Sequence, residues 1–148
     1  GFKYNMTDLQ AAMGLHQLAQ IEVNYARRAA IARAYEEAFA DLPLGRFAPP
    51  PAGSRHAHHL YMVLVDGRAG ITRDEAAERL AEAGVSTSVH FHPLHLHSYY
   101  RDRFGYSRGA FPVAEQLADT VLSLPLSPAL SDAQVDHVIS VVRRLFGG

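Results

Sequence analysis

A long helical segment near the start of the chain limits how the rest can fold. Thr7 and Gln10 have the spacing of a capping box, and the helical pattern continues to about Asp41, before Pro43. In its second half, apolar residues recur three and four positions apart, which places them on one helix face. The pattern predicts a helix of about 50 Å at 1.5 Å per residue.

The first half of this helix, residues 7–20, is apolar around almost its whole axis. Its apolar residues are Leu9, Ala11, Ala12, Met13, Leu15, Leu18 and Ala19. A helix that is apolar on all sides is typically buried. A chain of 148 residues is too small to bury it on every side. We therefore predict that residues 7–20 pack against another domain or a partner subunit.

The remaining sequence alternates strand and helix patterns. Strands are predicted over residues 60–65, buried on both faces, over 85–91, and over 122–126, where Pro125 indicates an edge strand. Helices are predicted over residues 72–83, 112–120 and 131–146, with an aromatic-rich connection over 94–111. This order predicts an α/β fold with a small sheet of about three strands covered by helices.

Composition excludes several classes of partner. The net charge of −1 gives no electrostatic footprint for nucleic acid. No apolar run approaches the roughly 20 residues that span a bilayer, so we expect no membrane partner. The chain has no cysteine, which favours a cytoplasmic location and rules out disulfides. Its only lysine is Lys3, so a lysine-dependent reaction would need Lys3 or a residue outside this sequence.

Seven of the nine histidines fall in two short clusters. One contains His56, His58 and His59; the other contains His90, His92, His95 and His97. Imidazole is a common transition-metal ligand, but Pro93 interrupts the second cluster and no carboxylate stands at a supporting spacing. We predict no metal site and keep a histidine metal-binding protein as the less favoured alternative. His90 differs from the others because it lies at the end of a predicted strand.

Three residues that can bind an anion precede the first helix. Lys3, Tyr4 and Asn5 lie just before Thr7, where free backbone N–H groups and the helix dipole attract negative charge. An amine and an amide at this place can bind a phosphate or a carboxylate. On these residues alone, a terminal segment with no binding role is the simpler interpretation.

A set of motifs in order along the chain adds a resemblance. These motifs are residues 1–12, Ala26-Arg27-Arg28 with Tyr35, and residues 56–61, 70–74, 84–91, 99–104 and 122–126. The chain resembles the DegT/DnrJ/EryC1/StrS sugar aminotransferases, which use pyridoxal phosphate (PLP). Within that family it is most similar to the UDP-4-amino-4-deoxy-L-arabinose aminotransferase type, which aminates UDP-4-keto-pentoses.

The resemblance implies that the chain is the C-terminal part of a longer homodimeric enzyme with shared active sites. Residues 1–42 would be a loop and a linking helix that packs on the large domain and the partner subunit. Residues 43–148 would be the small C-terminal domain of a fold-type-I PLP aminotransferase. Lys3 does not match the lysine that binds the cofactor covalently. The chain therefore holds no catalytic residue and should be inactive alone.

The resemblance also assigns the site residues. Asn5 and Lys3 are expected to bind the cofactor across the dimer, and which of them contacts the phosphate stays open because many relatives carry other residues at both positions. His90, Tyr4 and Phe91 are expected to contact the substrate.

The expected reaction moves an amino group, from glutamate, to a keto sugar of a nucleotide-sugar. The alternative from another class is a catalytically inert binding or dimerisation module of the same fold.

Overall fold

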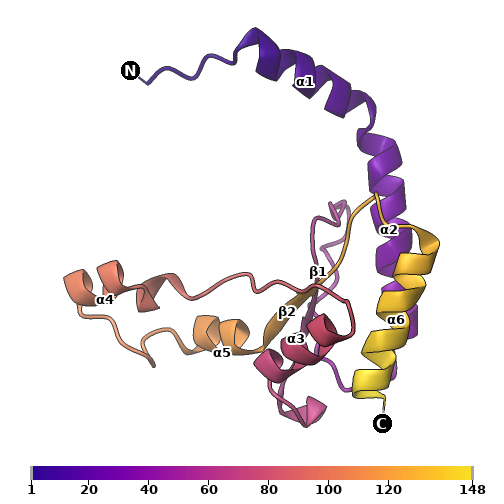
Figure 1. Cartoon of the computed structure of the whole chain (residues 1–148). Helices are drawn as coiled ribbons and strands as arrows, with labels where there is room; N and C mark the ends of the chain where they lie inside the picture. Colours follow the sequence, from indigo (N-terminus) through magenta and orange to yellow (C-terminus); the bar gives the residue numbers. More distant parts are fainter. Residues whose placement is uncertain (1, 148) are drawn as a thin grey trace.

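Two short antiparallel strands form the centre of the molecule. The computed structural model describes residues 2–147. Strand β1 (Tyr61–Leu64) pairs with β2 (Val121–Leu124), from Tyr61 opposite Leu124 to Leu64 opposite Val121. The helices are α1 (Asp8–Ala19), α2 (Ile21–Ala38), α3 (Arg73–Glu82), α4 (Ser98–Phe104), α5 (Pro112–Thr120) and α6 (Asp132–Phe146), with 3₁₀ turns η1 (Gly67–Ala69) and η2 (Leu94–Leu96). Figure 1 shows α2, α3 and α6 gathered around the two strands.

The hydrophobic core lies between these three helices and the sheet. Helix α6 contacts both α2 and α3, and α3 contacts β2. The largest fully buried side chains are Tyr35, Phe39, Ile31, Leu80, Leu122, Val85 and Val142. The Tyr35 ring stacks on Phe39 at 5.5 Å and meets Tyr61 edge-on at 5.1 Å. The stripe predicted for the second half of the long helix therefore builds the core.

Tyr35 also fixes the chain that follows β2. Its hydroxyl donates a hydrogen bond to the Pro125 carbonyl over 3.0 Å. Burial raises the pKa of Tyr35 to about 12, so the hydroxyl keeps its proton. We expect Tyr35→Phe to lower the free energy of unfolding by about 1–2 kcal/mol, since it leaves a carbonyl without its partner. Urea denaturation measures this, with the exposed Tyr99→Phe as the control. Equal losses in the two variants would contradict the assignment.

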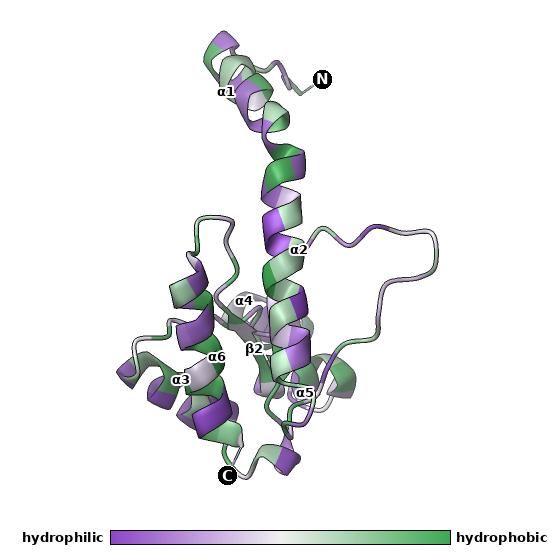
Figure 2. Ribbon diagram, turned by 90° about the vertical axis from the view of Figure 1, so that its right-hand side faces the viewer, coloured by the Kyte–Doolittle hydropathy of each residue, from purple (hydrophilic) through white to green (hydrophobic). Residues whose placement is uncertain are grey.

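The long helix is not continuous, contrary to the prediction. It breaks at Gln20, whose backbone N–H bonds back to the carbonyls of Gln17 and Leu18 in a tight last turn. Figures 1 and 2 show α1 bending away from α2 beyond the core. Helix α1 has no buried residue, so no tertiary packing holds the two segments in line. Its apolar side chains are exposed, including Leu9 at 73% and Leu15 at 71%.

The sheet also differs from the prediction in three ways. The expected strand over residues 85–91 is reduced to one bridge, Ser88 to Ser123, because the chain leaves the sheet after Ser88. Strand β2 is not an edge strand: it is buried along its length and lies between β1 and this bridge. Pro125 lies one residue beyond β2, so no hydrogen bond of the ladder is lost. Strand β1 alternates buried and half-buried residues rather than being buried on both faces.

The helix starts were predicted well because their signals are local. Thr7, Thr72 and Ser131 each form a complete capping box, and Pro112 occupies the first turn of α5. Gly84 follows α3 with a φ of 79°, a conformation in which glycine carries no steric cost. In the part of the chain that the structure describes, no helix has the length and hydropathy needed to cross a bilayer.

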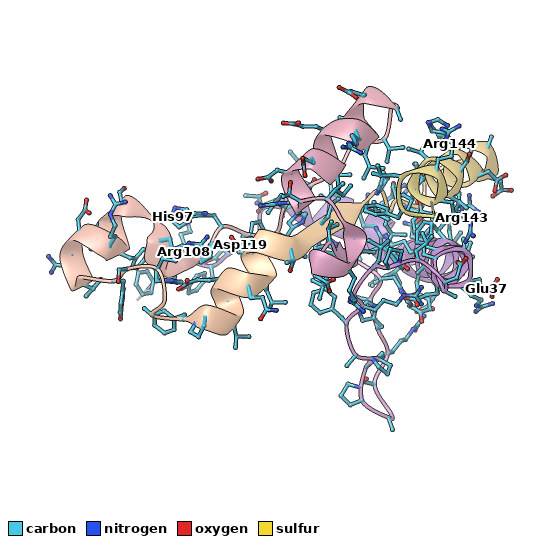
Figure 3. All side chains as sticks on the ribbon, turned by 90° about the horizontal axis from the view of Figure 1, so that it is seen from below. Glu37, His97, Arg108, Asp119, Arg143 and Arg144 are labelled. Carbon is cyan, nitrogen blue, oxygen red and sulfur yellow. The ribbon has the colours of Figure 1, made fainter. Side chains whose placement is uncertain are left out.

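Residues 94–119 form an arm that extends away from the core, and we call them the aromatic arm. Figure 1 shows η2, α4 and α5 projecting together to one side of the sheet. Arg108 and Asp119 join the loop after α4 to the end of α5, with two N–H···O distances of 2.8 and 2.9 Å. Figure 3 shows these two side chains next to each other.

Candidate functional site

The N-terminal segment presents three of the expected site residues to solvent. Residues 2–6 have no regular secondary structure. Lys3 and Asn5 are exposed, and the Tyr4 side chain is 87% exposed. Within residues 2–147, none of the three makes a hydrogen bond or an ion pair through its side chain. Figure 1 places this segment far from the sheet, so Lys3, Tyr4 and Asn5 form one surface that is separate from His90.

His90 and Phe91 form the second surface, beside β2. The backbones of Ser88 and Ser123 exchange two hydrogen bonds of 3.1 and 2.8 Å. This pairing brings His90 Nδ1 to 2.8 Å from Ser123 Oγ. His90 is half-buried, whereas Phe91 is 74% exposed and its ring meets the His90 ring edge-on at 4.8 Å. The sheet therefore orients His90, and Phe91 stands next to it facing solvent.

His95 is a residue whose role the sequence did not reveal. It is buried together with Glu115 in the aromatic arm, at 7% and 5% exposure. The Glu115 carboxylate accepts hydrogen bonds from the backbone N–H groups of Gly109 and Phe111 and from His95 Nε2 at 2.8 Å. The N–H of Gly109, then that of Phe111 and the His95 ring, hold the pKa of Glu115 below its ordinary value. A signal was present: Glu115 lies three residues before Ala118, on the buried face of α5.

His95, one member of the buried pair, lines a hollow in the aromatic arm. The hollow has a volume of about 510 Å³. It is lined by Leu94, His95, Tyr100, Phe104, Tyr106, Phe111 and Ala114. Because Glu115 binds Gly109 and Phe111, it fixes the loop that forms one wall. Glu115 thus supports the hollow through the loop without lining it.

The other histidines do not converge on a metal site. The rings of His92 and His97 meet edge-on at 4.9 Å, and His56 and His58 do the same at 4.7 Å. Burial, then the neighbouring His56, lowers the pKa of His58. Among residues 2–147, no group of three or more His, Cys, Asp or Glu side chains is arranged to hold a metal ion. The four histidines of the second cluster instead lie in separate contacts with Ser123, Glu115 and each other.

Comparison with known proteins decides the family. The model of the DegT/DnrJ/EryC1/StrS aminotransferase family matches residues 1–143. The chain belongs to this family. It is 46% identical over 151 residues to the spore coat polysaccharide biosynthesis protein SpsC of Bacillus subtilis, and 43% identical over 147 residues to the uncharacterized protein MJ1066 of Methanocaldococcus jannaschii. Those matches cover 100% and 98% of this chain but only 39% and 38% of the relatives.

Solved structures of aminotransferases have the same fold. Aminotransferase TlmJ from Streptoalloteichus hindustanus superposes with a TM-score of 0.83 at 35% identity, over 95% of this chain and 36% of TlmJ. Spr1654 from Streptococcus pneumoniae in its PMP form gives 0.85 at 30% identity, over 95% of this chain and 35% of Spr1654. Spr1654 has also been solved in a PLP form. The DegT/DnrJ/EryC1/StrS aminotransferases are PLP-dependent, and this chain has the α/β fold of their small domain.

The residues of this DegT/DnrJ/EryC1/StrS chain fit only part of a PLP site. An amine and an amide before a capped helix suit a phosphate, and Lys3 and Asn5 are exposed there. Covalent attachment of the cofactor requires a lysine inside a pocket. Lys3, the only lysine in the sequence, lies instead on an exposed segment and lines neither the hollow of the aromatic arm nor the one between α2 and residues 46–62. The described residues therefore offer exposed groups that suit a phosphate, and they include no lysine placed in a pocket for covalent attachment.

Proposed function

We propose that the chain is the C-terminal part of a PLP-dependent sugar aminotransferase that acts on a nucleotide-sugar. The observation that carries this proposal is the family match over residues 1–143, combined with the exposure of both site surfaces on the chain. SpsC takes part in making a spore coat polysaccharide by its name, which supports a sugar as the acceptor. We further propose glutamate as the amino donor and a UDP-4-keto-pentose as the acceptor.

The two site surfaces belong, in this proposal, to different active sites of a homodimer. Lys3 and Asn5 reach the cofactor held by the partner subunit, while His90 and Phe91 border the site of their own subunit. Exposure of α1 supports this arrangement, because its apolar side chains have no partner surface among residues 2–147. The residues 1–42 would then link the small domain to the large domain and to the partner.

The proposal gives the site residues of the chain different roles. When bound, PLP supplies an electron sink for moving the amino group. Asn5 and Lys3 bind it from the partner subunit, one of them through a charge-assisted hydrogen bond to its phosphate. His90 binds an oxygen of the substrate, and Tyr4 and Phe91 exclude water from the reacting groups. No residue of this chain takes the substrate proton, consistent with the position of its only lysine.

An assay of the intact enzyme tests the proposal. We expect the intact enzyme, given PLP, glutamate and a UDP-4-keto-pentose, to release 2-oxoglutarate and an amino sugar nucleotide, which mass spectrometry identifies. The 148-residue chain should give no product and no visible absorbance from bound PLP under the same conditions. Amination by the short chain, or no product from the intact enzyme with any keto sugar nucleotide, would overturn the proposal.

A dimerisation module of the same fold is the second candidate. The exposed apolar surface of α1, with Met13 at 62% and Leu18 at 64% exposure, favours association through residues 7–20. Sedimentation of the 148-residue chain distinguishes the two candidates. A stable dimer of the 148-residue chain, paired through residues 7–20, would favour the module.

A further inference from the structure

Ser123 lies at the centre of the sheet, in direct contact with His90. It is 4% exposed. It pairs with Met62 of β1 on one side and with Ser88 on the other. His90 follows Ser88 by two residues, which returns its side chain to the same side of an extended segment. The 2.8 Å contact between Ser123 Oγ and His90 Nδ1 is therefore set by the register of the sheet.

The hydrogen shared by Ser123 Oγ and His90 Nδ1 belongs to one of these two atoms. A neutral imidazole carries one N–H, on Nδ1 or on Nε2, and a serine hydroxyl has one hydrogen to donate. If Nδ1 carries the hydrogen, it donates to Ser123 Oγ, and the hydroxyl hydrogen needs another acceptor. Within residues 2–147, Ser123 Oγ has no hydrogen-bond partner other than His90. A buried donor without an acceptor is costly, so the hydroxyl donates to an unprotonated Nδ1.

The other nitrogen of His90 is free to bind a ligand. His90 Nε2 makes no hydrogen bond with residues 2–147, and Arg73 Nε is the one side-chain atom in that range that is both buried and without a hydrogen-bond partner. His90 Nε2 is therefore accessible. Nε2 lies on the side of the ring away from Ser123. A ligand that approaches His90 from that side therefore meets Nε2.

We propose that Ser123 is a positioning residue that holds neutral His90 as the Nε2–H tautomer. His90 then presents a hydrogen-bond donor, and the group it recognises is an acceptor oxygen of the substrate. In this state Nε2 donates a hydrogen to the substrate and cannot accept one, while Nδ1 accepts from Ser123. This inference rests on the proposed function only in taking His90 as a substrate contact; the tautomer itself is a property of the chain.

Nitrogen NMR of the imidazole tests the tautomer directly. In the ¹⁵N-labelled 148-residue chain at about pH 8, where a free imidazole is neutral, we expect His90 to show a pyridine-type Nδ1 and a pyrrole-type Nε2. Ser123→Val and Ser123→Thr are a matched pair that differ in the hydroxyl. The valine variant should move both shifts toward the averaged values of exchanging tautomers, and the threonine variant should restore them. His92 serves as the internal control.

The outcomes that overturn the inference need no enzyme activity. A pyrrole-type Nδ1 in the wild-type chain overturns it without any variant, so a variant that fails to fold does not block the test. Unchanged His90 shifts in a folded Ser123→Val chain, checked by its amide spectrum, also overturn it. If the tautomer is as expected and the intact enzyme aminates no sugar, the proposed function fails and this inference stands.

Kinetics of the intact enzyme then identify the oxygen. Ser123→Val should raise the KM of one substrate more than it lowers kcat. Ser123→Thr should restore that KM to its wild-type value. A rise for the keto sugar assigns a sugar oxygen, and a rise for glutamate assigns its carboxylate. No change in either KM, with the tautomer lost, would overturn the role of His90 as a positioned donor.

Discussion

Mixed dimers of two impaired variants are expected to recover activity. Asn5→Ala should weaken PLP retention in the intact enzyme about ten- to a hundredfold, the range for one lost hydrogen bond to a charged group. His90→Ala should impair substrate binding. If Asn5 serves the partner's site and His90 its own, a mixed dimer has one site that lacks both residues and one site that lacks neither.

Co-expression of the two variants measures this effect. We expect about one quarter of wild-type activity, because half of randomly paired symmetric dimers are mixed and half of their sites are intact. His92→Ala, which changes an exposed neighbouring histidine, is the control and should keep activity. Activity of the mixture no higher than that of either variant alone would show that Asn5 and His90 of one subunit serve the same active site. Lys3→Ala in the same design shows which of the two residues binds the phosphate.

Glu115→Gln is expected to loosen the loop around Gly109 and Phe111, which forms one wall of the hollow in the aromatic arm. The wild-type carboxylate accepts from Gly109, Phe111 and His95, whereas a glutamine turns an NH₂ group toward these donors. We expect the amides of Gly109 and Phe111 to exchange hydrogen about tenfold faster or more, as for buried donors that lose their acceptor. Amides of α3 and α6 should keep their protection, because they lie in the separate core.

The aromatic arm is expected to lose stability at acidic pH. The folded-state pKa of Glu115 is below its ordinary value of 4.5. The ionised carboxylate therefore stabilises the arm above pH 4.5, and this stabilisation is lost as the pH falls below that value. Fluorescence of Tyr100 and Tyr106 should change over this range in the wild type but not in Glu115→Gln. Asp119→Asn, which breaks only the exposed pair with Arg108, is the control, and an equal effect from it would contradict the role of Glu115.

Local chemistry explains which elements could be predicted from the sequence. The capping boxes at Thr7, Thr72 and Ser131 depend on residues three positions apart, so they can be recognised without the fold. The core stripe that includes Tyr35 and Phe39 has the same property. The family resemblance rests on short motifs and was confirmed over residues 1–143.

The predictions that were wrong concern features that depend on residues far apart in the sequence. The helix breaks at Gln20, and α1 before it has no buried residue, although the local sequence is that of one continuous helix. The strand over residues 85–91 has the right alternation, but only Ser88 meets a partner, since the chain departs toward the arm. The predicted strand over residues 122–126 includes Pro125, but β2 ends at Leu124.

For the candidate site, the sequence by itself determined the chemistry of each surface. Lys3, Tyr4 and Asn5 lie before a capped helix, and His90 lies beside Phe91, wherever the chain folds. Tertiary structure alone decided the partners. The register of β2 brings Ser123 to His90, and packing of α5 buries Glu115 against His95. These pairs are separated by 33 and 20 residues, a spacing over which no helical or strand periodicity carries information.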